Sequence, residues 1–309
     1  MKKRKEQRKK SRITRFIGWT IFLLLFIIGG LLTFFYFESK QLANDIHDPL
    51  GFTSNTKLKN KEPVAILLLG VDERPDDPGR SDTMIVMTIN PYTERLTLVS
   101  LPRDMYVDIP NRDGKDKLNH AYIYGGIPLT TKTIENVLRI PIDYAVQVNM
   151  EAFRDVVNAL GGVDVISPLD FDLEGYHINK GPIHLDGEKA LKYVRMRKED
   201  PRGDFGRQER QRQVLEAVIE KGTSVQSVLR YRSLFDAVST NVKTNLTFDE
   251  MMYLQKHYMD ATNDIRQLSF EEEGGAMINN IWYYIPDDDE LRDIQKQLRN
   301  ELRTTKKSE

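Results

Sequence analysis

The chain has 309 residues, a formal net charge of −1 and no cysteine. The absence of cysteine excludes a disulfide framework, thiol catalysis and a thiolate metal site, so stability must come from an ordinary apolar core. Residues 1–15 carry a charge of +8, which leaves about −9 on residues 16–309, and this acidic balance argues against a nucleic-acid binder.

The N-terminus predicts a membrane anchor. Residues 16–37 are an uncharged run of 22 residues, and a helix of that length spans about 33 Å, enough for a transmembrane helix. The basic head at residues 1–15 stays in the cytoplasm by the positive-inside rule, which predicts a single-pass type II protein of the cell membrane with its bulk on the extracellular face. A cleaved signal peptide and, for the head, a DNA-binding tail are the alternatives. Residues 38–62 lack periodicity and predict an extracellular stalk.

Three segments after the stalk predict a β-sheet. Residues 64–71 form a continuous apolar run, which is typical of a strand buried on both faces. Residues 83–89 and 95–101 flank the turn-forming residues 90–94 and predict a hairpin. The hairpin excludes an all-parallel sheet.

Helices and strands alternate further along the chain. Apolar spacing predicts helix 129–138, strand 144–148, helix 151–160, strand 163–166, a helix from Gly187 with Asp186 as its N-cap, and helix 205–221. This alternation predicts a layered α/β fold with a central mixed sheet. Residues 223–309 continue with helices 225–239 and 248–259, an aromatic patch at 281–285 and a charged tail, without a motif of assignable chemistry.

The loop between the first two strands predicts a cation site. Asp72 ends the first strand and Asp82 begins the next, so the two carboxylates could share one Mg²⁺ whose other ligands are substrate phosphates and water. Capping of turns by both aspartates is the alternative. Arg80 favours the site, because arginines beside carboxylates are typical of a cation held between acids and phosphates.

Arginines elsewhere in the chain supply candidate phosphate-binding groups that would complement the cation site. Arg103 follows a proline at the end of the third β segment, where an ion pair with Asp104 is the alternative. Guanidinium forks match phosphate oxygens, so the arginine-rich stretch 195–212 indicates diphosphate recognition. An internal charge network with the acids at 199, 200 and 204 is the alternative. The candidate ligands from this stretch are Arg195, Arg197, Arg207 and Gln211.

Other chemistries lack a pattern. The five histidines show no paired metal spacing, and neither a Ser-His-Asp arrangement nor a P-loop is visible. Acyl transfer and the use of nucleoside triphosphates are therefore disfavoured, and Mg²⁺-assisted phosphoryl transfer is the predicted activity.

Several longer motifs occur in order between residues 63 and 221: LLLGVDER, GRSDT, SLPRD, KLNHAYIYGG, VNMEAFRDVVNALGGV and LDGEKALKYVRMRKEDPRGDFGRQERQRQ. In these motifs and in its predicted anchor, the chain resembles the LytR-CpsA-Psr family of cell-wall glycopolymer ligases. The sequence PRGDFGRQ resembles the teichoic-acid-transferring members from Firmicutes, which implies a Gram-positive bacterium.

The resemblance implies a three-layer α/β/α domain at residues 63–222, with residues 223–309 as a mostly helical extension. An apolar tunnel would accept the polyprenyl tail of a lipid-linked glycopolymer, and the diphosphate would lie at its mouth. The implied reaction moves a glycosyl-phosphate, in the nearest members wall teichoic acid, from a polyprenyl-diphosphate-linked precursor to a muramic acid hydroxyl of peptidoglycan and releases polyprenyl phosphate.

The resemblance also implies residue roles. Asp72 and Asp82 would bind Mg²⁺ and, with Arg103, form the catalytic set, in which either aspartate is the nearest candidate to deprotonate the acceptor. A non-catalytic binding protein or scaffold for polyprenyl-diphosphate-linked glycans is the alternative. A transcriptional attenuator conflicts with an outward-facing domain. The residues implied to hold the diphosphate are Arg80, Arg103, Arg195, Arg197, Arg207 and Gln211.

Overall fold

The computed structural model describes residues 40, 47, 57–72, 79–222 and 242–303. The predicted basic head, the predicted transmembrane helix and the predicted helix at 225–239 lie outside these residues and stay predictions. Within the described residues, no helix is both long and apolar enough to cross a membrane.

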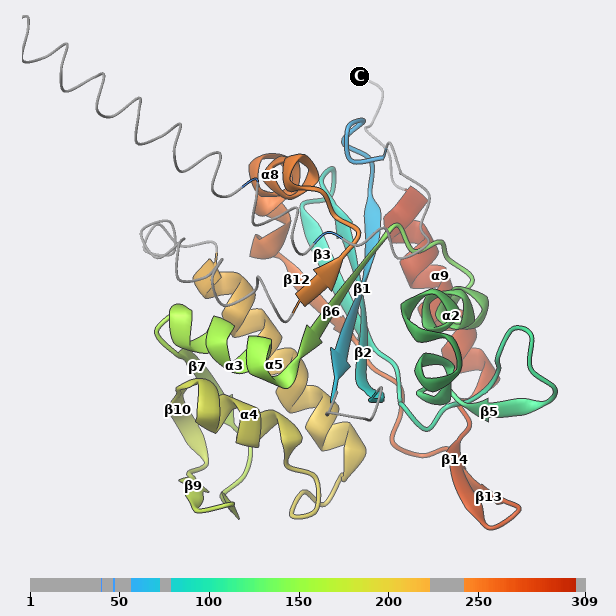
Figure 1. Ribbon diagram of the computed structural model, residues 1–309, viewed down its shortest axis with the longest axis vertical. Coiled ribbons are helices and arrows are strands. Elements are labelled where there is room, and N and C mark those ends of the chain that lie inside the picture. The colour runs from blue at the N-terminus through green and yellow to red at the C-terminus, as the bar shows by residue number, and fades with distance from the viewer. Residues whose placement is uncertain (1–39, 41–46, 48–56, 73–78, 223–241, 304–309) are drawn as a thin grey trace, which may run out of the picture. The chain divides into compact units, whose positions relative to one another are not determined.

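A six-stranded mixed sheet forms the centre of the fold, in the order β11-β6-β1-β2-β3-β12 (Figure 1). β1 pairs antiparallel with β2 and parallel with β6, β2 and β3 form an antiparallel hairpin, and β12 runs parallel to β3. The predicted mixed sheet is therefore confirmed. The strands are β1 (Val64–Val71), β2 (Ser81–Asn90), β3 (Arg95–Ser100), β6 (Tyr144–Asn149), β11 (Val242–Thr244) and β12 (Ile265–Leu268).

β1 is buried on both faces, as its sequence predicts. Leu67 and Leu69 belong to one apolar cluster and Val64 and Ile66 to another, since successive side chains of a strand point to opposite faces. Helices supply the other half of each cluster. An unbroken apolar run is therefore the sequence that this central position requires.

The turn between β2 and β3 is closed by one side chain. The Asn90 side-chain oxygen accepts hydrogen bonds from the backbone N–H of Tyr92 at 2.9 Å and of Thr93 at 3.2 Å. Asparagine favours turns for this reason, and the hairpin predicted around residues 90–94 is confirmed.

Helices cover both faces of the sheet (Figure 1). α2 and α9 lie on one face, whereas α3, α5 and α8 lie on the other, and α4 packs against α3 and α5. Helices on both sides of a mixed sheet are one of the stable layered arrangements. Their bounds are α2 (His120–Leu138), α3 (Met150–Ala159), α4 (Gly187–Arg195), α5 (Asp204–Gly222), α8 (Phe248–His257) and α9 (Asp288–Arg303).

Short hairpins and one 3-10 helix complete the described part of the chain. The pairs are β4 with β5, β7 with β10, β8 with β9, and β13 with β14. The bounds are β4 (Tyr106–Asp108), β5 (Lys115–Lys117), β7 (Val163–Ser167), β8 (Phe171–Leu173), β9 (Tyr176–Ile178), β10 (Gly181–Leu185), β13 (Gly275–Ile278), β14 (Ile281–Tyr284) and η1 (Met259–Asn263).

The start of α2 differs from the prediction of a helix at 129–138. The helix begins at His120 and is interrupted at Gly125 and Gly126, whose backbone angles are not helical. Pro128 then lies in the first turn of the second half, where a missing N–H costs little. The two glycines and the proline hid the first half from a reading based on apolar spacing.

The C-terminal segment contains more regular structure than predicted. The expected charged tail is the helix α9, which buries Ile294 and Leu298. Leu291, Ile294, Leu298 and Leu302 carry the three-and-four spacing of an amphipathic helix, a signal that the high charge of the segment obscured.

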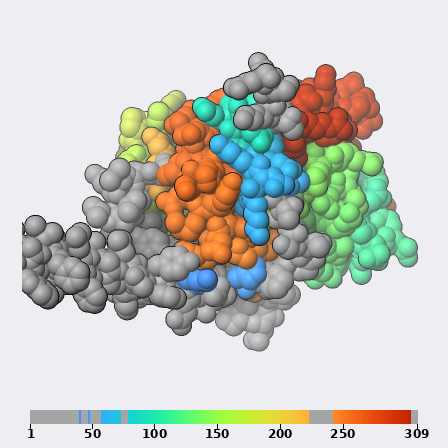
Figure 2. All heavy atoms as spheres, turned by 90° about the horizontal axis from the view of Figure 1, so that it is seen from above, coloured from blue at the N-terminus to red at the C-terminus, as the bar shows by residue number. Residues whose placement is uncertain are grey.

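The segment also supplies both edge strands of the sheet, β11 and β12. Figure 2 shows residues near 250–265 beside the start of β1, and there the Tyr258 hydroxyl donates to the Glu62 carbonyl oxygen at 2.6 Å. Residues from 242 onward thus share the central sheet and its apolar clusters.

Candidate active site

A cavity of about 460 Å³ lies where β1 ends and β2 begins. It brings together residues that are more than 130 positions apart in the sequence. Arg80 is exposed and is not among its described lining residues. The predicted site residues that line the cavity are Asp72, Asp82, Arg103, Arg195, Arg197, Arg207 and Gln211.

Arg103 is oriented by carboxylates. Its Nη1 donates to Asp82 Oδ2 at 2.8 Å, and its Nε lies 3.5 Å from Asp104 and 3.7 Å from Asp204. Burial lowers the pKa of Arg103, but Asp82 and the other two carboxylates outweigh burial and raise the pKa above its usual value. The ion pair with Asp104 anticipated as the alternative exists, and it leaves Arg103 in the cavity wall.

Arg207 is a buried cation with incomplete compensation. Its side chain is 9% exposed, and its Nη2 lies 2.6 Å from Asp204 Oδ1. Its Nε is buried without a hydrogen-bond partner. Burial lowers the pKa of Arg207, and the nearby cations Arg103 and Arg197 lower it further, against the opposing effect of Asp204 and Asp82. An anion in the cavity would stabilise the charged guanidinium, as expected of a phosphate site.

Arg195 and Arg197 reach the same cavity because α4 ends between them. Arg195 is the last helical residue, and Met196 has an extended backbone with φ −59° and ψ 132°. Residues two apart share a face only in extended chain, so this ending places both guanidinium groups at the cavity. Met196 between them also lines the cavity, is 2% exposed and belongs to an apolar cluster with residues of α4 and α5.

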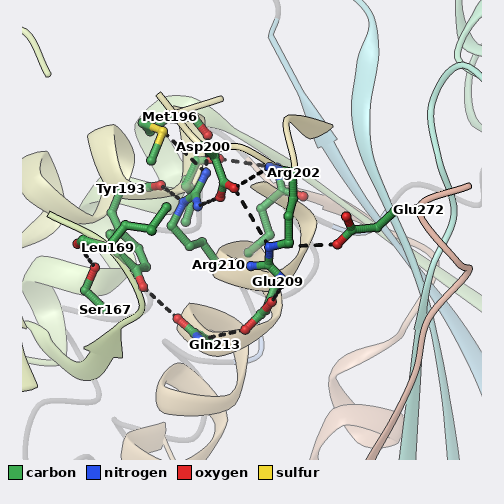
Figure 3. A network of polar contacts seen from close by, with 12 residues as sticks. Ser167, Leu169, Tyr193, Met196, Asp200, Arg202, Glu209, Arg210, Gln213 and Glu272 are labelled. Carbon is green, nitrogen blue, oxygen red and sulfur yellow. Dashed lines mark hydrogen bonds and ion pairs between the residues drawn. The ribbon is translucent and has the colours of Figure 1, made fainter. Parts of the chain in front are cut away.

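The internal charge network anticipated as an alternative exists in part: Arg207 pairs with Asp204, and a second arginine, Arg210, pairs with Asp200 (Figure 3). Arg210 and Asp200 form an ion pair in which both side chains are 0% exposed. The spacing of three and four residues along a helix places Arg210 on one stripe with Arg207 and Gln211. Arg210 instead points into the protein and is not among the lining residues of the cavity.

The carboxylates that line the cavity could hold one hard cation, provided that a bound substrate and water supply its remaining oxygen ligands. Among the described residues, no group of three or more His, Cys, Asp or Glu could hold a metal. Asp72 and Asp82 do line one cavity, and Mg²⁺ commonly takes one or two carboxylates together with phosphate oxygens and water. The donor set is therefore compatible with Mg²⁺ bound together with a phosphate substrate.

Asn119 contacts a candidate site residue and was missed by the sequence reasoning. Its Nδ2 donates to Asp82 Oδ1 at 3.4 Å, and its Oδ1 is buried without a hydrogen-bond partner. It immediately precedes α2, within the motif KLNHAYIYGG. The position of a polar residue at a helix start was the available signal.

A second, apolar cavity of about 270 Å³ adjoins the first. It lies between the sheet and the helices α3 and α5, where Val146, Phe153 and Leu215 are among its walls. The two cavities share five lining residues, so a charged cavity and an apolar cavity lie side by side. The shared residues are Thr83, Met150, Val194, Arg195 and Gln211.

Known proteins share this sequence and fold over most of their lengths. The chain is 44% identical over 304 residues to the polyisoprenyl-teichoic acid–peptidoglycan teichoic acid transferase TagU of Bacillus subtilis, covering 97% of this chain and 99% of TagU. A solved structure described as a transcriptional regulator from Enterococcus faecalis is 40% identical, with a TM-score of 0.73 over 81% of this chain and 90% of that one.

A structure of TagT bound to LIIa-WTA is 32% identical, with a TM-score of 0.67 over 83% of this chain and 93% of that one. The model of the LytR_cpsA_psr family matches residues 33–300, which extends beyond the motifs at 63–221 and includes the C-terminal strands and most of α9. The chain therefore belongs to the LytR-CpsA-Psr family.

Proposed function

We propose that this chain is a phosphotransferase that moves a glycosyl-phosphate, in particular wall teichoic acid, from a polyprenyl-diphosphate carrier to peptidoglycan. The observation that carries the proposal is that the arginine-lined cavity adjoins the apolar cavity and shares lining residues with it. A polyprenyl diphosphate has the same two parts, a charged head and an apolar chain. The names of TagU and of TagT bound to LIIa-WTA agree with such a substrate.

The reaction breaks the phosphoanhydride bond of the diphosphate and forms a phosphoester bond to the acceptor. The muramic acid hydroxyl oxygen forms a bond to the phosphorus that carries the glycan, and the bond from that phosphorus to the bridging oxygen breaks. The bridging oxygen leaves with the polyprenyl phosphate, and the hydroxyl proton passes to a carboxylate, for which Asp72 or Asp82 is the nearest candidate. No covalent enzyme intermediate is needed.

The arginines would supply positioning and charge compensation. Arg103 is held by Asp82 and Arg207 by Asp204, so both guanidinium groups are fixed before a ligand binds. Phosphoryl transfer depends mainly on orientation and on stabilising negative charge at the phosphate oxygens. Arg195 and Arg197 are more exposed and would close on the diphosphate from the end of α4.

Mg²⁺ is the proposed cofactor, held by Asp72 and Asp82 together with the diphosphate. When bound, it would neutralise charge on the phosphate oxygens. The chain would act as an anchored protein on the extracellular face of the cell membrane, where enzyme and lipid substrate share one surface.

The test is a transfer assay with the full-length chain in detergent. It would be incubated with a polyprenyl-diphosphate-linked glycan and peptidoglycan oligomers, with and without Mg²⁺, and the products followed by mass spectrometry. We expect a phosphodiester-linked glycan that requires Mg²⁺ and is lost in Asp82→Ala. Asp113→Ala, which changes an exposed aspartate outside the cavity, is the matched control.

The alternative, a carrier or scaffold that binds the lipid without reaction, predicts a different result. Tight binding of the lipid-linked glycan without product, under conditions in which a TagU relative gives product, would favour the carrier. A transcriptional role has less support, because the arginine-lined cavity suits a diphosphate and the chain outside the basic head carries about −9.

A further inference from the structure

Arg210 bonds simultaneously to the end of α4 and to the loop that follows it. Its Nε donates to the Tyr193 carbonyl oxygen at 3.1 Å, and its Nη2 donates to the Met196 carbonyl oxygen. Its Nη1 pairs with Asp200. Figure 3 shows these groups converging on one guanidinium. All the contacts lie in a region where both members of the ion pair are 0% exposed.

These hydrogen bonds satisfy backbone carbonyl groups at the C-terminal end of α4. The last carbonyl groups of a helix lack partners within the helix and carry its negative dipole end. α5 provides the partners here, since Arg210 bonds the carbonyls of Tyr193 and Met196, and the Gln211 side chain donates to the Val194 carbonyl oxygen at 3.5 Å. The end of α4 is thereby tied to α5, which also carries Arg207.

The loop after α4 is held by Asp200, the carboxylate partner of Arg210 in the ion pair. Asp200 Oδ1 accepts from the Arg202 backbone N–H at 2.9 Å, and the Asp200 backbone N–H donates to the Arg197 carbonyl oxygen at 3.3 Å. Gly206 of α5 packs so closely that a Cβ there would lie 1.9 Å from Asp200 Oδ2. Asp200 therefore holds the chain from Arg197 onward in one conformation.

We infer that Arg210, with Asp200, is a positioning residue that sets the geometry of Arg195 and Arg197 at the cavity without touching the ligand. The inference rests on the proposed diphosphate site and names the group that pre-organises it. A guanidinium has the planar fork needed to reach one carboxylate and two carbonyls at once, whereas a lysine ammonium is a single point charge on a flexible stem. The arginine itself, and not only its charge, is required.

Arg212 provides a matched control on the same helix. It is also buried, at 6% exposure, and its Nε donates to Gln267 of β12 at 2.8 Å. It does not line the cavity and makes no described bond to the segment 193–200. A change at Arg212 therefore perturbs the core without acting on Arg195 or Arg197.

The first measurement is hydrogen exchange of the full-length chain in detergent, without ligand. In Arg210→Lys, the amides of residues 196–200 should exchange faster by on the order of tenfold, because opening of this segment is no longer resisted by the fork. In Arg212→Lys, the same amides should exchange as in the wild type. Equal exchange of residues 196–200 in wild type and Arg210→Lys would overturn the positioning role.

The second measurement is affinity for geranylgeranyl diphosphate in the same detergent. Arg210→Lys should weaken binding by on the order of tenfold, whereas Arg212→Lys should not. Because Arg210 acts through the arginines at the end of α4, the same change should have little further effect in a chain that already carries Arg195→Ala and Arg197→Ala. An equal loss of affinity in both backgrounds would contradict the inference.

A variant without the buried charge pair separates positioning from charge. Arg210→Met combined with Asp200→Asn leaves no unpaired buried ion, and such replacements often preserve folding. It should melt cooperatively and bind as weakly as Arg210→Lys, and binding at the wild-type level would overturn the inference. Failure of the wild-type chain to bind the probe would contradict the proposed function, and the exchange measurement would still decide the positioning role.

Discussion

Arg207 and Arg210 lie one turn apart on α5, and both are buried, yet their surroundings differ. Arg210 has a carboxylate and two backbone carbonyls around its guanidinium. Arg207 has one close carboxylate, an Nε without a partner, and other cations nearby. The described groups around Arg210 satisfy its guanidinium, whereas the Nε of Arg207 is buried without a hydrogen-bond partner, as a group that awaits an anion would be.

The difference teaches that residue type and spacing do not separate structural from functional arginines in this segment. Both residues belong to the same arginine-rich stretch, and helical spacing alone places them on one stripe. The hydrogen-bond partners of each arginine decide whether its role is structural or functional. A buried cation with its partners in place contributes to the fold, whereas one that lacks them lowers stability and is able to bind an anion.

Removing the unsatisfied arginine gives the largest expected effect. Arg207→Ala should reduce transfer by at least about a hundredfold, as does the loss of one donor to developing charge in other enzymes, and Arg103→Ala should do the same. Because burial lowers the pKa of Arg207, its charged form is disfavoured in the fold, and thermal melting should show no loss of stability. Arg154→Ala, at a half-buried ion-paired position outside the cavity, is the control. Wild-type activity in both site variants would remove the proposed site.

Filling the apolar cavity should affect only substrates with a long tail. Val156 lines this cavity, and Val156→Phe would exclude part of a polyprenyl chain. Each excluded methylene costs about 0.8 kcal/mol, so the loss for three is about 2 kcal/mol. Binding of geranylgeranyl diphosphate and of dimethylallyl diphosphate would be compared by calorimetry, with Ile123→Phe at an exposed position as control. Equal losses for both ligands would argue against a tail site.

A larger side chain beside Asp200, the partner of Arg210, should reduce the stability of the fold. In Gly206→Ala, the new Cβ would lie 1.9 Å from Asp200 Oδ2, so the Asp200–Arg210 pair must shift. Overpacking of this kind costs about 1–3 kcal/mol, which chemical denaturation would measure. Gly222→Ala, on the same helix with nothing near its Cβ, should be neutral or stabilising. Unchanged stability of Gly206→Ala would mean that Asp200 is not held as tightly as the geometry indicates.

A charge outside the cavity should give the smallest effect. Burial raises the pKa of Asp116, but hydrogen bonds from His120 and Tyr124 outweigh burial and hold it below its usual value of 3.8. A lowered carboxyl pKa stabilises the fold above the unfolded-state pKa and loses that contribution as pH falls through the folded-state pKa. Asp116→Asn should therefore cost less than about 1 kcal/mol at pH 7.

The stability difference between wild type and Asp116→Asn should shrink below about pH 4. Denaturant unfolding across this range would measure it, and Asp113→Asn, at an exposed position in the turn before β5, is the control. A difference that grows toward low pH would show that the sign of the shift is wrong.

Much of the fold was readable from local sequence. The apolar run of β1 predicts a central strand, and the residues around Asn90 predict the hairpin, because both depend on burial pattern and turn chemistry within a few residues. The first half of α2 was missed, since Gly125, Gly126 and Pro128 interrupt its pattern. The edge strands β11 and β12 are three and four residues long and depend on pairing partners distant in sequence.

For the site, the sequence by itself determined which residues could bind phosphate and a cation. Carboxylates at strand ends and a high density of arginine are properties of composition and short spacing, and they indicated a diphosphate site with the cavity residues named above. Sequence spacing does not show that these residues, which are far apart in the chain, come together at one cavity.

Only the tertiary structure decided how the arginines divide their roles. Arg80 is not among the lining residues of the cavity, Arg210 points into the core, and Arg207 faces a cavity that adjoins an apolar one. These assignments depend on how α4 and α5 pack against each other and against the end of β1. Whether a buried charge is satisfied is settled by groups that folding brings together from distant parts of the chain.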